Sequence, residues 1–302
     1  MSPKNNRRGI LAMLLAMAFF ITNDSLLKLA SATMPPGQIM AVRGLFATAM
    51  ALSIVAATGQ LGSLAKLASP FAALRAGLEA IVAFLFISSL PHLPLAIITA
   101  IVQSTPLIMT LAMVVLGPER VRWRRWSAIV VGFLGVLVIV RPGPAGMNLY
   151  ALVALAAAVL VAGRDLATRF VPADVPSTVV ALASTASVGL AGLIAGLGET
   201  WPPLGGREMS YIIGAGILVT LGNLANIMAF RNTDVSVVSP FRYSVILWAI
   251  LSGFVVFGEL PDPTAVIGIA LIIASGVYTI HRENVRQREA ARLAALAARE
   301  AA

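Results

Sequence analysis

Apolar residues run through this chain in long stretches rather than in the alternating patterns of an ordinary soluble fold. A helix needs about 20 residues to cross a hydrocarbon core of about 30 Å. Runs of this length recur ten times, and short alternating strands do not. The pattern therefore predicts an all-α integral membrane protein with transmembrane helices at 9–30, 36–57, 71–90, 94–116, 124–141, 148–170, 177–198, 208–230, 235–257 and 262–281.

Composition supports this class, because the chain is 59% hydrophobic and only 12% charged. An average soluble domain has about 45–50% apolar and about 25% charged residues. The net charge of +9 does not predict a nucleic-acid partner, since the basic residues form neither a soluble basic face nor a recognition motif.

The basic residues instead follow the positive-inside rule. If both termini are cytoplasmic, the only basic residues in the segments on the outer side of the membrane are Lys28, Arg141 and Arg207. We therefore expect a multi-pass protein of a bacterial-type cytoplasmic (inner) membrane, with the lipid bilayer as its surroundings.

The two halves of the chain resemble each other at a constant offset of 141 residues. The matching pairs are Asp24 and Asp165, Lys28 and Arg169, Pro35 and Pro176, Gly117 and Gly258, and Gly135 and Gly276. A unit of five spans repeated once must insert its second copy upside down. We expect a cytoplasmic segment 1–8, repeats at 9–141 and 148–282, and a cytoplasmic tail 283–302.

Each copy places a basic residue four positions after its aspartate, Lys28 after Asp24 and Arg169 after Asp165. Such residues share a helix face and can pair. One interpretation is a helix-end charge pair that fixes the depth of the helix, and the other is a role in gating or substrate contact.

Four features resemble the drug/metabolite transporter superfamily, and specifically proteins with two EamA-type repeats. They are the terminal Lys28 of span one, Arg43 early in span two, the run from Pro106 to Gly117, and Gly258-Glu259 followed by a last helix with Gly268 and Gly276. The resemblance covers about residues 9–281. It implies a transporter that exports amino acids, other small metabolites or cationic drugs, and the YddG-type amino-acid exporters are the first members for comparison.

Polar side chains in mid-membrane either pair internally or line an aqueous cavity, which makes them candidate substrate-binding residues. Prolines interrupt spans four and nine, and such breaks in matching spans indicate a central transport site. We therefore expect spans three, four, eight and nine to wall the cavity, although kinks used only for packing are an alternative. The candidates are Glu79, Gln103, Asn223, Asn226, Arg242, Tyr243 and Ser244, with Pro106 and Pro240 as hinge or kink residues.

Several of these residues have two interpretations. Glu79 can be the structural partner of Arg75 or a proton-accepting group. Arg242 can bind a substrate carboxylate or satisfy carbonyls freed near Pro240. Asn223 and Asn226 can instead join helices by hydrogen bonds.

We predict a secondary transporter that exports small metabolites, foremost amino acids, by alternating access. A multidrug or nucleotide-sugar carrier is the alternative within this class, and a channel or non-transporting scaffold the alternative outside it. The sequence shows no catalytic motif, no cofactor motif and no metal-binding cluster. Proton coupling is possible, and a monomer and a homodimer both remain open.

Overall fold

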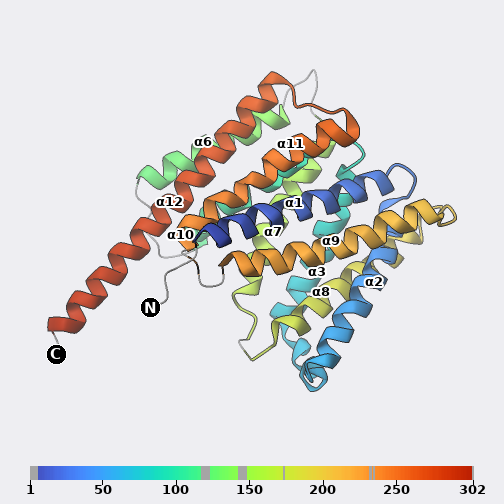
Figure 1. Cartoon of the computed structure of the whole chain (residues 1–302), viewed down its shortest axis with the longest axis horizontal. Helices are drawn as coiled ribbons and strands as arrows, with labels where there is room; N and C mark the ends of the chain where they lie inside the picture. The colour runs from blue at the N-terminus through green and yellow to red at the C-terminus, as the bar shows by residue number, and fades with distance from the viewer. Residues whose placement is uncertain are drawn as a thin grey trace.

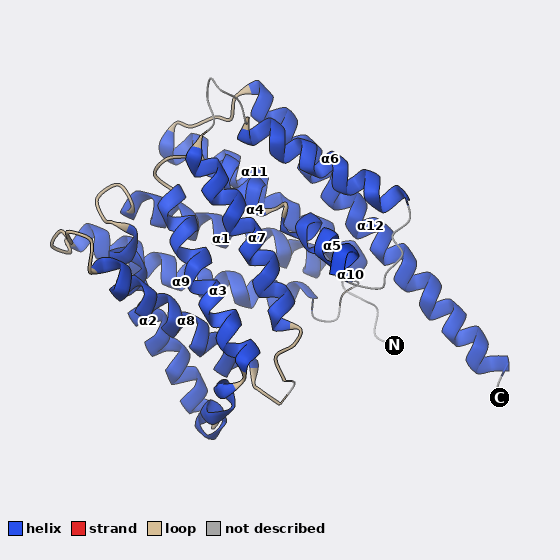
Figure 2. Ribbon diagram, turned by 180° about the vertical axis from the view of Figure 1, so that it is seen from behind, coloured by secondary structure: helices blue, strands red, loops and turns tan. Residues whose placement is uncertain are grey.

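The computed structural model describes residues 6–116, 123–141, 148–172, 174–230, 233 and 235–300. In this part of the chain the regular elements are helices, without a strand (Figure 2). Nine helices of the described residues are long and apolar enough to cross a membrane, and a shorter apolar helix covers Trp126–Val140. The predicted all-α membrane fold is confirmed.

The helices lie within a few residues of the expected spans. The first copy contains α1 (Asn6–Ala30), α2 (Pro36–Ala57), the short helix η1 (Leu61–Ala68), α3 (Pro70–Ser89), α4 (Leu95–Val102), α5 (Thr105–Leu116) and α6 (Trp123–Val140). The second contains α7 (Leu149–Thr168), α8 (Ser177–Gly196), α9 (Gly206–Phe230), α10 (Val235–Val238), η2 (Ser239–Tyr243), α11 (Ser244–Phe257) and α12 (Pro263–Glu300). Residues 283–300 are not a separate tail but continue α12 away from the bundle (Figure 1).

Local chemistry explains where the last two helices end and begin. α11 ends at Gly258, whose φ of 67° lies in the left-handed region that favours glycine. Asp262 caps α12 by accepting hydrogen bonds from the amides of Thr264 and Ala265, both at 3.0 Å. Hydrogen bonds from the Thr264 hydroxyl and the Ala265 amide, together with the Arg141 guanidinium, lower the pKa of Asp262 to about 2. The stabilisation by the charged Asp262 cap is therefore fully present above the ordinary carboxyl pKa. It is lost as the pH falls through about 2.

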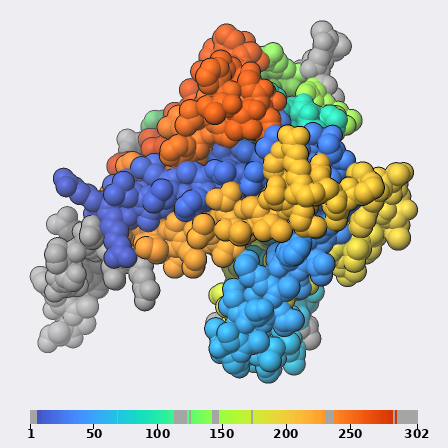
Figure 3. All heavy atoms as spheres, turned by 45° about the vertical axis from the view of Figure 1, so that its right-hand side comes forward, coloured from blue at the N-terminus to red at the C-terminus, as the bar shows by residue number. Residues whose placement is uncertain are grey.

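Helices of one copy pack mainly on helices of the other. α1 lies along α9, as Figure 3 shows for the blue and yellow-orange helices, and α7 lies along α3 in the same way. α2 packs on α8, and α6 packs on α12. Exchanging the two copies turns the α1–α9 contact into the α7–α3 contact and leaves the α2–α8 and α6–α12 contacts as they are. This is the arrangement of a two-fold repeat.

Contacts at the helix ends show that the second copy is inverted. Lys28, near the end of α1, donates a hydrogen bond of 2.8 Å to the carbonyl of Leu93. The neighbouring His92 ring stacks on Tyr150, at the start of α7, with ring centroids 3.6 Å apart. The first helix of copy one therefore ends where the first helix of copy two begins, at what we name the Lys28 end. α7 ends and α3 begins at the opposite end, which we name the Arg75 end.

The inter-copy contact of α2 with α8 depends on glycines. A Cβ added to Gly44 would lie 2.3 Å from the Cα of Gly189, and one added to Gly192 would lie 2.4 Å from the amide nitrogen of Ala41. Small residues of this kind let membrane helices approach closely, so that dispersion contacts hold them together.

Replacing Gly44 by alanine should therefore destabilise the protein by about 1–3 kcal/mol, because the backbone of Gly189 cannot move aside as a flexible side chain can. Thermal melting of purified protein in detergent measures the effect. Gly77→Ala in α3 is the matched control, since a Cβ there meets nothing within 4 Å. Equal melting temperatures for the two variants would contradict the close approach of α2 and α8.

Candidate functional site

Charged side chains from four helices form a network inside the bundle. They are Asp24 of α1, Arg43 of α2, Arg75 and Glu79 of α3, and Arg164 and Asp165 of α7. We name these six residues the charge network. Both copies contribute to it, because α7 packs on α3.

Arg164 holds two carboxylates of the charge network. Its Nη1 donates to Glu79 Oε2 at 2.9 Å, and its Nη2 donates to Asp165 Oδ1 at 2.7 Å. The exposed fractions of the Arg164, Glu79 and Asp165 side chains are 22%, 27% and 40%. Partial burial strengthens these pairs relative to surface salt bridges and makes an unpaired member costly.

Asp24 has a related arrangement in the first copy. The Asn23 amide donates to Asp24 Oδ1 at 2.8 Å, and Arg43 lies within electrostatic range of both Asp24 and Glu79. Asn23 and Asp24 occupy the positions of Arg164 and Asp165 at the offset of 141 residues. Each copy thus keeps an aspartate that accepts a hydrogen bond from the residue before it.

The charges are spread along the membrane axis. Asp24 lies six residues from the Lys28 end of α1, about 9 Å along the helix. Glu79 lies at the middle of α3, and Arg164 lies four residues from the Arg75 end of α7, about 6 Å along that helix. The charge network therefore crosses much of the bilayer with acidic and basic groups in turn.

The predicted pairing of Asp24 with Lys28 is wrong. The Lys28 ammonium lies 2.7 Å from both carboxylate oxygens of Glu259 and 4.8 Å from the centroid of the Phe257 ring. It also donates to the Leu93 carbonyl, so that it joins α1 to both the α3–α4 and the α11–α12 connections. The equivalent pairing of Asp165 with Arg169 is wrong as well, because Arg164 takes the carboxylate.

Glu79 forms its ion pair with Arg164 rather than with Arg75, which stays within electrostatic range of Glu79. Arg75 instead donates through Nε to the Thr168 hydroxyl at 3.0 Å and through Nη1 to the Ser184 hydroxyl. Neighbours at i and i+4 on one helix can pair, but here Arg164 of the packed helix α7 binds the Glu79 carboxylate.

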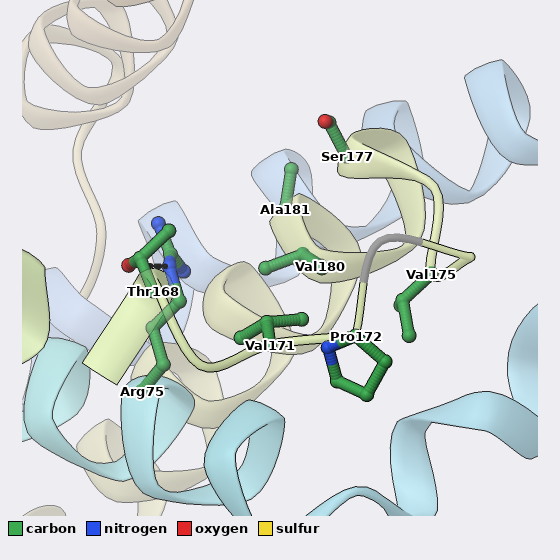
Figure 4. Close-up of a pocket in the computed structure, with 8 residues that line it drawn as sticks. All are labelled: Arg75, Thr168, Val171, Pro172, Val175, Ser177, Val180 and Ala181. Carbon is green, nitrogen blue, oxygen red and sulfur yellow. Dashed lines mark hydrogen bonds between the residues drawn. The ribbon is translucent and has the colours of Figure 1, made fainter. Parts of the chain in front are cut away.

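A pocket of about 320 Å³ opens at the Arg75 end. Figure 4 shows Arg75 reaching from α3 to Thr168 beside the connection from α7 to α8. The lining residues are Arg75, Thr168, Val171, Pro172, Val175, Ser177, Val180 and Ala181.

Spans four and nine are both broken helices, and their halves α4 and α11 pack on each other. Pro106 lies in the first turn of α5, and its missing amide leaves the Val102 carbonyl without its helical partner. The Thr105 hydroxyl replaces that partner with a hydrogen bond of 2.6 Å. Pro240 lies within η2, in the equivalent span of the second copy.

The other predicted residues lie at or near these breaks and on α9. Gln103 and Asn226 are half-buried, Asn223 and Arg242 are exposed, and none of these side chains hydrogen-bonds to a described residue. The hydroxyls of Tyr243 and Ser244 are buried without a partner among the described residues. Tyr243 lies against α12, where a Cβ added to Gly276 would meet its hydroxyl oxygen.

The charge network thus unites Glu79 with residues outside the predicted set. Sequence reasoning missed Arg164, and it gave Asp24 and Asp165 either a helix-end charge pair or a role in gating or substrate contact. The signal that could have identified them is the alignment of Asp24 with Asp165, because two intramembrane aspartates at one repeat position are unusual on cost alone.

Comparison with known proteins agrees with this architecture. The model of the EamA-like transporter family matches residues 7–141 and 148–280. The chain is 25% identical to the pseudopaline exporter CntI of Pseudomonas aeruginosa over 270 residues, which is 89% of this chain and 94% of that protein. A solved crystal structure superposes with a TM-score of 0.59 at 22% identity, over 89% of this chain and 95% of that one, and so shares the fold.

Two further relatives match over shorter segments. The riboflavin transporter of Vibrio cholerae is 28% identical over 190 residues, 63% of each chain. The S-adenosylmethionine uptake transporter of Rickettsia felis is 26% identical over 192 residues, 63% of this chain and 65% of that protein. The chain thus spans just under two thirds of these two relatives. The family model matches both halves, and the described residues form nine membrane-length apolar helices and a shorter one. The chain therefore belongs to the EamA-like transporter family of the drug/metabolite transporter superfamily.

Proposed function

We propose that this protein exports small zwitterionic metabolites, foremost amino acids, by alternating access. The charge network is the observation that carries the proposal. In a medium without water every charge needs a partner. A zwitterion brings one charge of each sign, so it can exchange partners with an ion pair such as Glu79–Arg164 without leaving a net charge unpaired.

The two ends of the molecule support loading from the cytoplasm. With both termini cytoplasmic, as the positive-inside rule favours, the Arg75 end faces the cytoplasm. A pocket opens at that end, and at the Lys28 end the Lys28–Glu259 pair joins the two copies. An exporter that loads its substrate from the cytoplasm needs a pocket at this end.

Polar side chains of the broken spans and of α9 support an aqueous path between the copies. Gln103, Asn226 and Arg242 make no hydrogen bond to a described residue. An arginine at membrane depth that makes no hydrogen bond to the described residues requires water or lipid headgroups around it. We propose that these three side chains face water in the transport cavity.

Counterflow in proteoliposomes tests the function. Vesicles loaded with an unlabelled amino acid should transiently accumulate the same radiolabelled amino acid from outside, because a carrier exchanges one molecule for another. A channel would equilibrate the label without an overshoot, as would leaky protein-free vesicles. Two relatives are named as transporters of riboflavin and of S-adenosylmethionine. If one of these compounds gave an overshoot and no amino acid did, the proposed substrate class would be contradicted.

Glu79 is the group that we propose for proton coupling, because its carboxylate lies at mid-membrane and forms its ion pair across the two copies. Glu79→Gln should abolish accumulation driven by an imposed pH gradient, since glutamine cannot release a proton. It should spare exchange at equal pH, because Asp165 still forms an ion pair with Arg164. Glu208→Gln, at the start of α9, is the control and should keep both activities. Wild-type transport that ignores the pH gradient would remove the proposed coupling.

A further inference from the structure

Arg75 differs from the other paired arginine of the charge network in the kind of partner that it has. Arg164 binds two carboxylates, whereas Arg75 donates only to the neutral hydroxyls of Thr168 and Ser184. Glu79 and Asp165 lie within electrostatic range of Arg75, but among the described residues no carboxylate accepts a hydrogen bond from its guanidinium. A guanidinium prefers the two oxygens of a carboxylate in a parallel fork over single hydroxyls.

The surroundings hold this guanidinium in place. Thr168 in turn donates to the carbonyl of Arg164 at 2.8 Å, and Ser184 donates to the carbonyl of Val180 at 3.0 Å. Ser187 ties α8 to α3 through a hydrogen bond of 2.7 Å to the carbonyl of Ala76. Arg75 is therefore braced by α7 and α8, and an incoming anion would not have to immobilise a free side chain.

The pocket in front of Arg75 suits a small ligand with one acidic and one apolar part. Its volume of about 320 Å³ lies at the lower limit of ligand pockets. The wall beyond Arg75, Thr168 and Ser177 is apolar, and consists of Val171, Pro172, Val175, Val180 and Ala181. A short aliphatic chain could cover this wall while its carboxylate reaches the guanidinium (Figure 4).

We infer that this pocket is a loading subsite in which Arg75 binds the carboxylate of a small metabolite with an apolar side chain. The inference rests on the proposed function and narrows its substrate class. The ligand's carboxylate accepts from Nη2, while Thr168 and Ser184 keep their hydrogen bonds to Nε and Nη1. Arg75 is thus a substrate-contacting residue, one turn nearer the Arg75 end of α3 than Glu79.

Equilibrium binding to purified protein tests the subsite with three probes. Leucine carries the carboxylate, the ammonium and the apolar chain, 4-methylpentanoate lacks the ammonium, and leucine amide lacks the carboxylate. Radiolabelled leucine should be displaced by 4-methylpentanoate and only weakly by leucine amide. Arg75→Gln should weaken leucine binding about tenfold to hundredfold, as expected for one charge-assisted hydrogen-bonded pair, and Arg75→Lys should fall between.

Arg207→Gln is the matched control, because Arg207 lies at the Lys28 end and bonds to Tyr211 on its own helix. It should leave leucine affinity unchanged, and the melting temperatures of all variants show whether they are folded. Wild-type protein that binds leucine and leucine amide equally, or neither, would overturn the subsite, as would unchanged leucine affinity in folded Arg75→Gln. Binding that depends on Arg75 without counterflow would overturn the proposed function alone.

Discussion

Arg164→Met should abolish counterflow, because it removes the guanidinium that holds both Glu79 and Asp165. Each carboxylate is then left half-buried without its main partner. An unsatisfied polar group of this kind costs about 1–3 kcal/mol, and more when it is charged. We therefore expect a lower melting temperature as well as lost exchange, measured on purified protein and in proteoliposomes.

A variant without any of the three charges separates stability from transport. Replacing a whole buried ion pair by neutral groups is often neutral in free energy, whereas removing one partner is not. The triple variant Arg164→Met, Glu79→Gln, Asp165→Asn should accordingly recover the melting temperature and still fail to exchange substrate. Arg207→Met, outside the charge network, should keep both properties. Exchange by the folded triple variant would show that the network only supports the fold.

Lys28→Met should raise the population of the state in which the Lys28 end is open. Lys28 is 7% exposed and joins α1 to Glu259 and to the Leu93 carbonyl, so the closed arrangement of this end loses three polar contacts at once. Ser25 lies one turn below, is 4% exposed and hydrogen-bonds to Ser252 across the copies at 2.6 Å. The chain contains no cysteine, so Ser25→Cys provides a single reporter of opening.

Labelling of this cysteine by a membrane-impermeant maleimide measures the population of the open state. Each 1.4 kcal/mol lost by the closed state should raise the labelling rate about tenfold. Lys66→Met is the control, because Lys66 also pairs with an acidic residue but at the Arg75 end, where both Lys66 and Asp174 are exposed. Such a surface pair contributes little. An unchanged labelling rate in Lys28→Met would show that Lys28 anchors helices without controlling access.

The spans and the repeat were predictable from sequence, because the length of an apolar run and a constant offset can both be found along the chain without knowing which helices pack together. A helix of about 20 apolar residues crosses the bilayer whatever its neighbours are. The constant offset of 141 then gives two copies of five spans, and the odd number inverts the second. Breaks in spans four and nine were equally local, because proline removes a helical hydrogen bond wherever it stands.

Only the tertiary structure decided the partner of each charge. Sequence spacing brought Lys28 to Asp24 and Arg75 to Glu79, since residues four apart share a helix face. In the folded chain Lys28 pairs with Glu259, 231 residues away, and Glu79 pairs with Arg164, 85 residues away. The physical reason is that a buried charge takes the partner with the best geometry and the least water, and the inverted packing of the copies brings in candidates that no local pattern contains.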